Sequence, residues 1–559
     1  MEKVIKTAIN DVLASWSFSD VNFVVEHPAE LAHGDYATNV AMVVAKRKGE
    51  APRQVAEQLV AALQDQIEYV DRLEIAGPGF INFFLSRDFF ANEIARINEL
   101  NDKWGSNQTQ KGEVVLLEYT SPNLFKPLHI GNLVGNIIGE SLSRLFEFSG
   151  ADLKRLNYPS DIGPTVAKGV WGLKTHQLDP QDISALGEAY RLGNEAYENN
   201  PEAKVEIDAI NKALYERSDE KLVELYETGI ATSKRSLAEM CAILGTKFDA
   251  EFTESQASGI GAEIVRSNIG KVFKESEGAV VYEGEKVGLH TRVFLNSKGL
   301  PTYEAKDLGN FTLKQNQYPN WTQSLVVTGN EQQEYFKVLF ASIKELFTLA
   351  DAQKLEHIPT GFLTLTTGKM SSRKGNVFTG TASLAEIRES AREKAENTRT
   401  DNLEEMIDMV AVGALKYQIL RQSPGSNIIY DKEKALSFEG DSGPYLQYTH
   451  ARIGSVLEKA KQVSLELNTN SYPDTPYEIE KIIYRFEEVI EEALIERAPH
   501  KVVGYLTELA GEFNSFYAQE KIADQEDVNA PYKIAIAEAV KITLKNGLWV
   551  LGIKAPDSM

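Results

Sequence analysis

The clearest pattern of apolar and polar positions lies between residues 114 and 150. Val114–Leu117 is a short, uninterrupted apolar run, which predicts a strand buried on both faces, as in a parallel sheet. A polar stretch follows, and apolar residues then recur at helical spacing as far as Gly150, which predicts a helix that ends at this glycine. The apolar positions of this predicted helix are Leu133, Ile137, Ile138, Leu142, Leu145 and Phe146.

Similar patterns divide the whole chain into three predicted domains of a multidomain α/β protein. Residues 1–105 have helical patterns at both ends and an alternating strand after a turn within 74–83, which predicts an α+β N-terminal domain. Residues 113–376 alternate strands and helices, as in a doubly wound parallel-sheet (Rossmann-like) domain. A charged helical insertion at about 179–240 interrupts this domain, and we interpret it as a solvated subdomain. Residues 377–559 predict an all-α bundle.

The start of the helix predicted behind Val114–Leu117 carries His129, Gly131 and Asn132. A helix N-terminus offers free N–H groups and a partial positive charge, and a glycine lets a ligand approach the backbone closely. This segment therefore predicts a phosphate site. Taken alone, the same residues fit an ordinary helix cap equally well.

A second polar segment, Gly368–Asn376, lies much further along the chain and contains Lys369, Arg373 and Lys374. A plain solvated turn would have the same composition. The two segments in this order, however, resemble the nucleotide-binding signatures of class I aminoacyl-tRNA synthetases. In that class the second segment is a mobile Lys-Met-Ser loop that faces the same phosphates.

Composition narrows the class of protein. A hydrophobic content of 43% and a charged content of 25% are those of an ordinary soluble globular protein, and no apolar run is long enough to span a bilayer. Met1–Trp16 resembles an amphipathic helix and lacks the features of a signal peptide. Cys241 is the only cysteine, so no intramolecular disulfide forms, and we expect it to fill a core in a cytoplasmic protein.

Charge and metal-ligand content bear on the partners. The net charge of −22 lowers the expectation of a nucleic-acid partner, although a specific RNA surface needs only a local basic patch. One cysteine and eight scattered histidines offer no zinc-ligand cluster, so we predict no protein metal site.

Several segments together resemble one member of the class, the arginyl-tRNA synthetases. The resemblance runs from about residue 30 to the last residue and omits only the insertion. The matching segments are Ala32–Ala41, Glu74–Phe83, Glu118–Pro127, Pro301–Asp307, Gly440–Arg452, Phe513–Tyr517 and Leu551–Met559. This resemblance implies a ligase that uses ATP to join L-arginine to tRNA(Arg) through an arginyl-adenylate.

The resemblance also implies which residues hold arginine. Tyr303 and Asp307 fall on the positions that recognise the guanidinium, and they share one face if their segment is helical. The remaining arginine-binding positions are Glu118, Asn123 and Gln332. Without the family, Asp307 would be read as an exposed helix charge. A guanidinium site rejects lysine because its buried acceptors would stay unpaired, so no editing domain is expected.

The catalytic and ATP-binding residues follow in the same way. The resemblance places His129, Gly131, Asn132 and Lys126 on the ATP phosphates from one side. From the other side it places the loop residues Lys369, Met370, Ser371, Arg373 and Lys374. The chemistry implies Mg²⁺ bridging the phosphates of ATP. Asn132 and Ser372 depart from the class pattern, which has a histidine and a lysine at these positions.

The resemblance implies that the helical C-terminal domain reads the anticodon and that the N-terminal domain binds the elbow of the tRNA. Tyr445, Tyr448, Phe516 and Tyr517 are candidates for stacking on unpaired bases, although most of them are better explained as core positions. We expect a monomer without a membrane partner, and activation that requires bound tRNA.

Two other interpretations stay open at this stage. One is a class I synthetase for another amino acid, such as cysteine or glutamate. The absence of zinc ligands counts against cysteine, and Asp307 with Glu118 suits a cationic side chain better than glutamate. The second is a catalytically silent RNA-binding paralogue, which the departures at Asn132 and Ser372 keep open.

Overall fold

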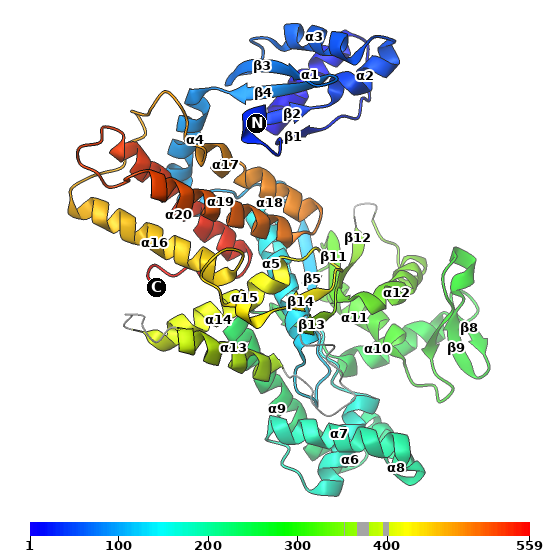
Figure 1. The fold of residues 1–559 in the computed structure, drawn as a ribbon. Helices are drawn as coiled ribbons and strands as arrows, with labels where there is room; N and C mark the ends of the chain where they lie inside the picture. Colours follow the sequence, from blue (N-terminus) through cyan, green and yellow to red (C-terminus); the bar gives the residue numbers. More distant parts are fainter. Residues whose placement is uncertain (351–352, 366–379, 395–401) are drawn as a thin grey trace. The chain divides into compact units, whose positions relative to one another are not determined.

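The structure is a computed structural model that describes residues 1–350, 353–365, 380–394 and 402–559 (Figure 1). These residues form two compact units. The first unit comprises residues 1–104, 452–487 and 508–546, and the second comprises residues 105–451, 488–507 and 547–559. The three predicted domains remain a proposal, because the units group the C-terminal helices differently.

A five-stranded parallel sheet forms the centre of the second unit, in the order β12-β11-β5-β6-β7. Its middle strand, β5 (Val114–Glu118), confirms the strand predicted from the apolar run. The other strands are β6 (Asp152–Asn157), β7 (Ala250–Glu251), β11 (Gln323–Gly329) and β12 (Lys354–Thr360). β5 is central, and its residues Val115, Leu116 and Leu117 are at most 1% exposed. The doubly wound parallel sheet is thereby confirmed.

Helix α5 (Ile130–Phe148) connects β5 to β6 and confirms the predicted helix. All six of its predicted apolar positions are buried. The helix ends at Phe148 with Ser149 as its C-cap, one residue before the predicted Gly150, whose φ is 89°. The chain passes from β5 through α5 to β6 on one side, and from β11 through α12 (Gln333–Leu346) to β12 on the other. The connections therefore diverge between β5 and β11, where doubly wound sheets bind their ligands.

Four helices form a bundle between β6 and β7: α6 (Pro164–His176), α7 (Ile183–Asn199), α8 (Pro201–Glu216) and α9 (Glu220–Leu244) (Figure 1). They confirm the helical insertion, which includes α6 as well as the predicted range. The bundle encloses its own apolar core, with Val170, Leu186, Ile207 and Leu214 among its buried residues. Phe125, from the segment after β5, belongs to the same core.

A second apolar core lies around α10 (Glu254–Ser267) and α11 (Tyr303–Gln317). Between these two helices, β8 (Lys274–Ser276), β9 (Ala279–Tyr282) and β10 (Arg292–Leu295) form an antiparallel sheet. α10 and α11 touch through glycines, since a Cβ on Gly261 would lie 1.7 Å from the carbonyl oxygen of Ala305. This close contact fixes α11, which carries two of the predicted arginine-binding residues, Tyr303 and Asp307.

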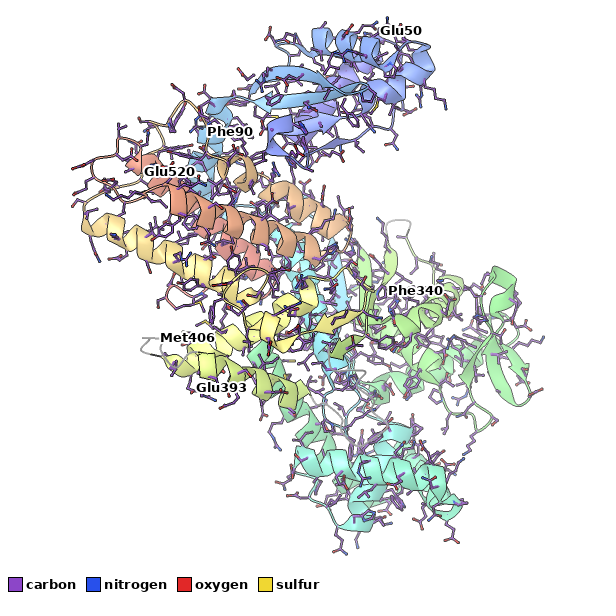
Figure 2. All side chains as sticks on the ribbon, viewed as in Figure 1. Glu50, Phe90, Phe340, Glu393, Met406 and Glu520 are labelled. Carbon is purple, nitrogen blue, oxygen red and sulfur yellow. The ribbon has the colours of Figure 1, made fainter. Side chains whose placement is uncertain are left out.

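The first unit contains an antiparallel sheet in the order β1-β2-β4-β3. The predicted turn and strand at 74–83 form the hairpin of β3 (Val70–Ala76) and β4 (Phe80–Leu85), with glycines at positive φ in the turn. The other elements of the N-terminal segment are α1 (Glu2–Ser15), β1 (Val25–Glu26), β2 (Tyr36–Thr38), α2 (Val40–Lys48), α3 (Pro52–Leu63) and α4 (Arg87–Leu100). Phe90 of α4, labelled in Figure 2, is buried.

The described residues after 379 are mainly helical, as predicted. Their helices are α13 (Gly380–Lys394), α14 (Leu403–Leu420), α15 (Lys432–Ala435), α16 (Gly443–Gln462), α17 (Glu480–Ile483), α18 (Phe486–Ile495), α19 (Pro499–Gln519) and α20 (Ala530–Val550). One short strand interrupts them, β14 (Ile428–Tyr430), which pairs with β13 (Leu363–Leu365). In the part of the chain that the structure describes, no helix combines the length and apolarity needed to cross a bilayer.

A buried carboxylate on α5 ties the helix to the strands on either side of it. Glu140 is 3% exposed and accepts hydrogen bonds from the Tyr119 hydroxyl at 2.7 Å and from the guanidinium groups of Arg144 and Arg155 at 2.8 and 3.2 Å. The Glu140 carboxylate is thus the shared hydrogen-bond acceptor for two guanidinium groups and one hydroxyl, and these three groups would lose their common partner without it.

Replacing this carboxylate is therefore expected to destabilise the second unit. Glu140→Leu leaves two guanidinium groups without their buried partner and should lower stability by about 3–5 kcal/mol. The matched control is Glu147→Gln, which removes only the outer partner of Arg155 and should cost at most about 1 kcal/mol. Differential scanning calorimetry measures both effects as shifts of the unfolding midpoint. Equal shifts for the two variants would contradict the importance of Glu140.

Candidate active site

The segment between β5 and α5 has an unusual backbone. Thr120, Ser121 and Phe125 all have positive φ angles, of 74°, 33° and 65°. Residues other than glycine rarely adopt this conformation, which costs of order 1–3 kcal/mol each and is concentrated at functional sites. The segment, residues 119–129, is called the phosphate loop below because it leads to the predicted phosphate site.

His129 lies at the N-cap of α5, as the sequence predicts. The backbone N–H of His129 donates to Asn132 Oδ1 at 3.1 Å, and Asn132 Nδ2 lies 3.5 Å from the carbonyl oxygen of Thr120. Asn132 was predicted to contact ATP, and in the structure its amide secures the helix start and the phosphate loop. The departure from the class pattern at this position thus has a structural explanation.

Gly131 leaves room for the ring of His129. A Cβ on Gly131 would lie 2.9 Å from His129 Nδ1, so a side chain there would displace the imidazole. The glycine was predicted to admit a nucleotide, and its visible consequence is the placement of His129 over the first helical turn.

The predicted phosphate-binding side chains of the loop, Lys126 and His129, lack acidic partners among the described residues. Burial lowers the pKa of Lys126, and the charge of Lys168 acts in the same direction. The surrounding protein and the charge of Lys126 lower the pKa of His129 as well, which favours the neutral imidazole. Among the described residues, no acidic side chain forms an ion pair with Lys126 or His129. A bound anion would stabilise the protonated forms of these two side chains.

Glu118 ends β5 and is 5% exposed. Its carboxylate accepts a hydrogen bond from Asn310 Nδ2 at 2.9 Å and forms an ion pair with Lys314 Nζ at 2.5 Å. Both partners lie on α11. In the structure Glu118 therefore joins the carboxyl end of β5 to α11, and its predicted contact with arginine remains a prediction.

Asp307 is the unusual acid of the site. It lies on α11 beside these residues, accepts a hydrogen bond from the Tyr335 hydroxyl of α12, and keeps intermediate exposure. No cationic side chain of the described residues lies within ion-pair distance of it. Burial raises the pKa of Asp307 to about 8, and the charges of Glu118 and Glu254 act in the same direction. An unpaired carboxylate that still reaches solvent is suited to bind a cation.

The other predicted arginine-binding residues lie at the same edge of the sheet or at the start of α11. Tyr303 begins α11 four positions before Asp307 and is 55% exposed. Gln332 is exposed at the end of the 3-10 helix η4 (Asn330–Gln332) that follows β11. Asn123 lies in the phosphate loop, where its backbone bridges to Ser160 after β6. The carboxyl ends of β5, β6 and β11 thus bring these segments together.

Four residues near Asp307 were not predicted from the sequence: Asn310, Lys314, Tyr335 and Glu254. Asn310 and Lys314 follow Asp307 at helical spacing on α11, so the periodicity of that helix contained a usable signal. Tyr335 and Glu254 come from other helices, and no pattern in the sequence links them to Asp307. Glu254 is 4% exposed and pairs with Lys306 of α11 at 2.5 Å.

The second predicted phosphate-binding segment lies outside the described residues. This applies to Lys369, Met370, Ser371, Ser372, Arg373 and Lys374. Within the described ranges, no group of three or more His, Cys, Asp or Glu side chains is placed to hold a metal ion.

The cysteine and the four aromatic residues considered for base stacking differ in their exposure. Cys241 is buried in α9, as predicted, and burial raises the pKa of its thiol to about 12, which makes it unreactive. Phe516 is 5% exposed, so the core interpretation holds for it, whereas Tyr517 is 43% exposed. Tyr445 and Tyr448 on α16 have intermediate exposure.

A parallel sheet whose connections diverge beside a helix N-terminus, with a histidine at that terminus, agrees with the resemblance to class I aminoacyl-tRNA synthetases. The family models agree. Residues 94–431 match the catalytic domain of class I (R) tRNA synthetases, residues 446–559 match a DALR anticodon-binding domain, and residues 2–85 match the arginyl-tRNA synthetase N-terminal domain. The chain belongs to the arginyl-tRNA synthetase family.

Individual relatives support this assignment over the full chain. An arginine–tRNA ligase 1 of Bacillus cereus is 31% identical and covers 96% of this chain and 95% of its own length. An arginine–tRNA ligase of Borrelia hermsii is 29% identical, with 99% of both chains covered. The arginyl-tRNA synthetase of Thermus thermophilus shares the fold, with a TM-score of 0.81, 24% identity and both chains fully covered.

The raised pKa of Asp307 predicts a pH-dependent effect on stability. An acid whose pKa is raised by folding destabilises the folded protein once it ionises, so this penalty grows from about pH 4 to about pH 8 and is constant above. Asp307→Asn should therefore raise the stability of the free protein by roughly 1–3 kcal/mol at pH 8.

Thermal unfolding at pH 5 and pH 8 measures this effect. The difference between variant and parent should be clearly smaller at pH 5, which serves as the internal control. A difference that is the same at both pH values would show that Asp307 is not the titrating group.

Proposed function

We infer that this protein joins L-arginine to tRNA(Arg) in two steps, with ATP consumed and AMP and pyrophosphate released. Membership of the family supports the type of reaction. The structural observation that supports arginine as the substrate is the environment of Asp307. A partly exposed carboxylate on α11 without a cationic partner among the described residues is what a permanently charged, planar guanidinium requires.

Arginine binding would supply the cationic partner that Asp307 lacks in the free protein. We propose that the guanidinium binds Asp307 and Tyr303, and that Glu118, Asn123 and Gln332 hold the remainder of the amino acid. Lysine has a compact ammonium that cannot bind a carboxylate in bidentate fashion, so it leaves acceptors unpaired. A site of this kind rejects the wrong side chain by roughly 10⁴-fold without editing.

In the first step the arginine carboxylate attacks the α-phosphorus of ATP and expels pyrophosphate. The reaction needs positioning and charge stabilisation more than a protein acid or base. We propose that the N-terminus of α5, neutral His129 and Lys126 donate to the phosphates from one side. Lys369, Met370, Ser371, Arg373 and Lys374, outside the described residues, are proposed to act from the other.

Mg²⁺ is proposed to enter the site bound to the phosphates of ATP. The described residues offer no cluster of metal ligands, so no protein group is assigned to the ion. When bound, it would neutralise phosphate charge.

In the second step the terminal ribose hydroxyl of the tRNA attacks the acyl carbon and expels AMP. We propose that residues 446–559 read the anticodon and that residues 2–85 bind elsewhere on the tRNA, in keeping with the family models that match them. A monomer acting in the cytoplasm, with bound tRNA needed for activation, also remains a proposal.

ATP–pyrophosphate exchange with each of the twenty amino acids tests the proposed function. Exchange should occur with arginine alone, and assays with and without tRNA decide whether activation requires it. No exchange under any condition from folded protein would favour a silent RNA-binding paralogue. Exchange with another amino acid would reassign the substrate.

The same assay tests the role of His129. His129→Ala removes a donor to the phosphates and should lower the arginine-dependent exchange rate about 10²- to 10³-fold. His290→Ala, at an exposed histidine before β10, is the matched control and should retain the parent rate. An unchanged rate in His129→Ala would remove His129 from the site.

A further inference from the structure

The helices α6–α9 hold three consecutive residues of the phosphate loop: Phe125, Lys126 and Pro127. These residues lie immediately before His129, although the helices that contact them come much later in the sequence. No sequence pattern connects the insertion with the phosphate site, and the interpretation from sequence was a solvated subdomain. The contacts indicate a more direct role.

Phe125 is fully buried, and its ring packs against two glycines, Gly169 and Gly229, which are called the seat below. A Cβ on Gly229 of α9 would lie 2.4 Å from Phe125 Cζ, and a Cβ on Gly169 of α6 would lie 2.6 Å from Phe125 Cδ1. The backbone N–H of Phe125 also donates to Ser233 Oγ of α9 at 3.1 Å. Since φ of Phe125 is 65°, these contacts hold a conformation that the residue would otherwise leave.

The next two residues contact one face of α7. Lys126 Nζ lies 4.8 Å from the centre of the Tyr190 ring, at cation–π distance. A Cβ on Gly187 would lie 2.8 Å from Pro127 Cδ, so α7 and the loop pack closely there. Gly187 and Tyr190 are three residues apart on the helix and therefore share a face.

The bundle that makes these contacts is itself tightly joined. A Cβ on Gly193 of α7 would lie 2.0 Å from the carbonyl oxygen of Lys168 on α6. Lys168 Nζ donates to Asn194 Oδ1 of α7 at 2.8 Å and lies 4.5 Å from the centre of the Tyr197 ring. A displacement of either helix would thus be transmitted to the loop.

We propose that the α6–α9 bundle sets the position of the phosphate loop, with Gly169, Gly229 and Tyr190 as positioning residues for the ATP-dependent step. The proposal rests on the proposed function of the loop. The bundle acts through Phe125 on the backbone that leads to His129, and through Tyr190 on the ammonium of Lys126. A shift of about 1 Å in such groups can lower a rate by about 10²-fold.

Single alanines in the seat test the backbone contact. Gly229→Ala should displace Phe125 and lower kcat for arginine-dependent ATP–pyrophosphate exchange by about tenfold or more. Gly259→Ala is the matched control, because Gly259 lies on α10 with open space at its Cβ position, and it should retain the parent rate. Gly229→Ala with the rate of Gly259→Ala would overturn the proposal.

A second substitution separates positioning from simple destabilisation. Leucine at position 125 lacks the ring atoms Cζ, Cε1 and Cε2 that a Cβ on residue 229 would meet. The double variant Gly229→Ala/Phe125→Leu should therefore regain the rate of Phe125→Leu alone. Gly169→Ala should not be rescued in this way, since its Cβ would meet atoms that leucine retains. Equal rescue of both, or of neither, would contradict the seat.

Tyr190 tests the contact with Lys126. Tyr190→Phe keeps the ring and should retain the parent kinetics, whereas Tyr190→Leu should raise the KM for ATP at least severalfold. Equal kinetics for the two variants would remove Tyr190 from its proposed role.

Hydrogen exchange of residues 120–129 provides a readout that needs no activity. Faster exchange in Gly229→Ala than in Gly259→Ala supports the proposal even if the parent protein fails to activate arginine. That failure would overturn the proposed function alone. Unchanged exchange in Gly229→Ala would overturn the positioning role.

Discussion

An acid that has no cationic partner is costly to ionise inside a folded protein, and the site is organised around one such acid, Asp307. Most buried carboxylates of the second unit have cations beside them: Glu140 has two arginines, Glu118 has Lys314, and Glu254 has Lys306. Asp307 has only the Tyr335 hydroxyl among the described residues. Under the proposed function, the arginine substrate would supply the cation that Asp307 lacks.

The sheet and its neighbours place this acid near the phosphate loop. Parallel strands deliver the ends of β5 and β11 to one edge, α11 crosses close to β5 through Glu118, and α5 begins with His129. The loop between β5 and α5 cannot hold its positive-φ residues by local forces alone. The helical bundle supplies that support through Phe125, so an element that looks peripheral in sequence belongs mechanically to the site.

The central strand and the helix behind it were predictable from the sequence, because each has a clear apolar pattern. The buried run at Val114–Leu117 and the helix behind it could be placed because a central parallel strand is apolar on both faces. Asp307 could be assigned only by family resemblance, since a lone acid on a helix is usually solvated. The contacts of Phe125 with Gly169 and Gly229 were out of reach. They depend on backbone packing between segments distant in sequence, and a glycine in a helix gives no local indication of what it touches.

We propose that arginine binds as the cationic partner of Asp307. Isothermal titration calorimetry of arginine into the protein at pH 7, in buffers of different ionisation enthalpy, tests it most directly. With a pKa of about 8 the acid is mainly protonated before binding, so about one proton should be released for each arginine bound. The release should be absent in Asp307→Asn. A binding heat that does not depend on the buffer would contradict the claim.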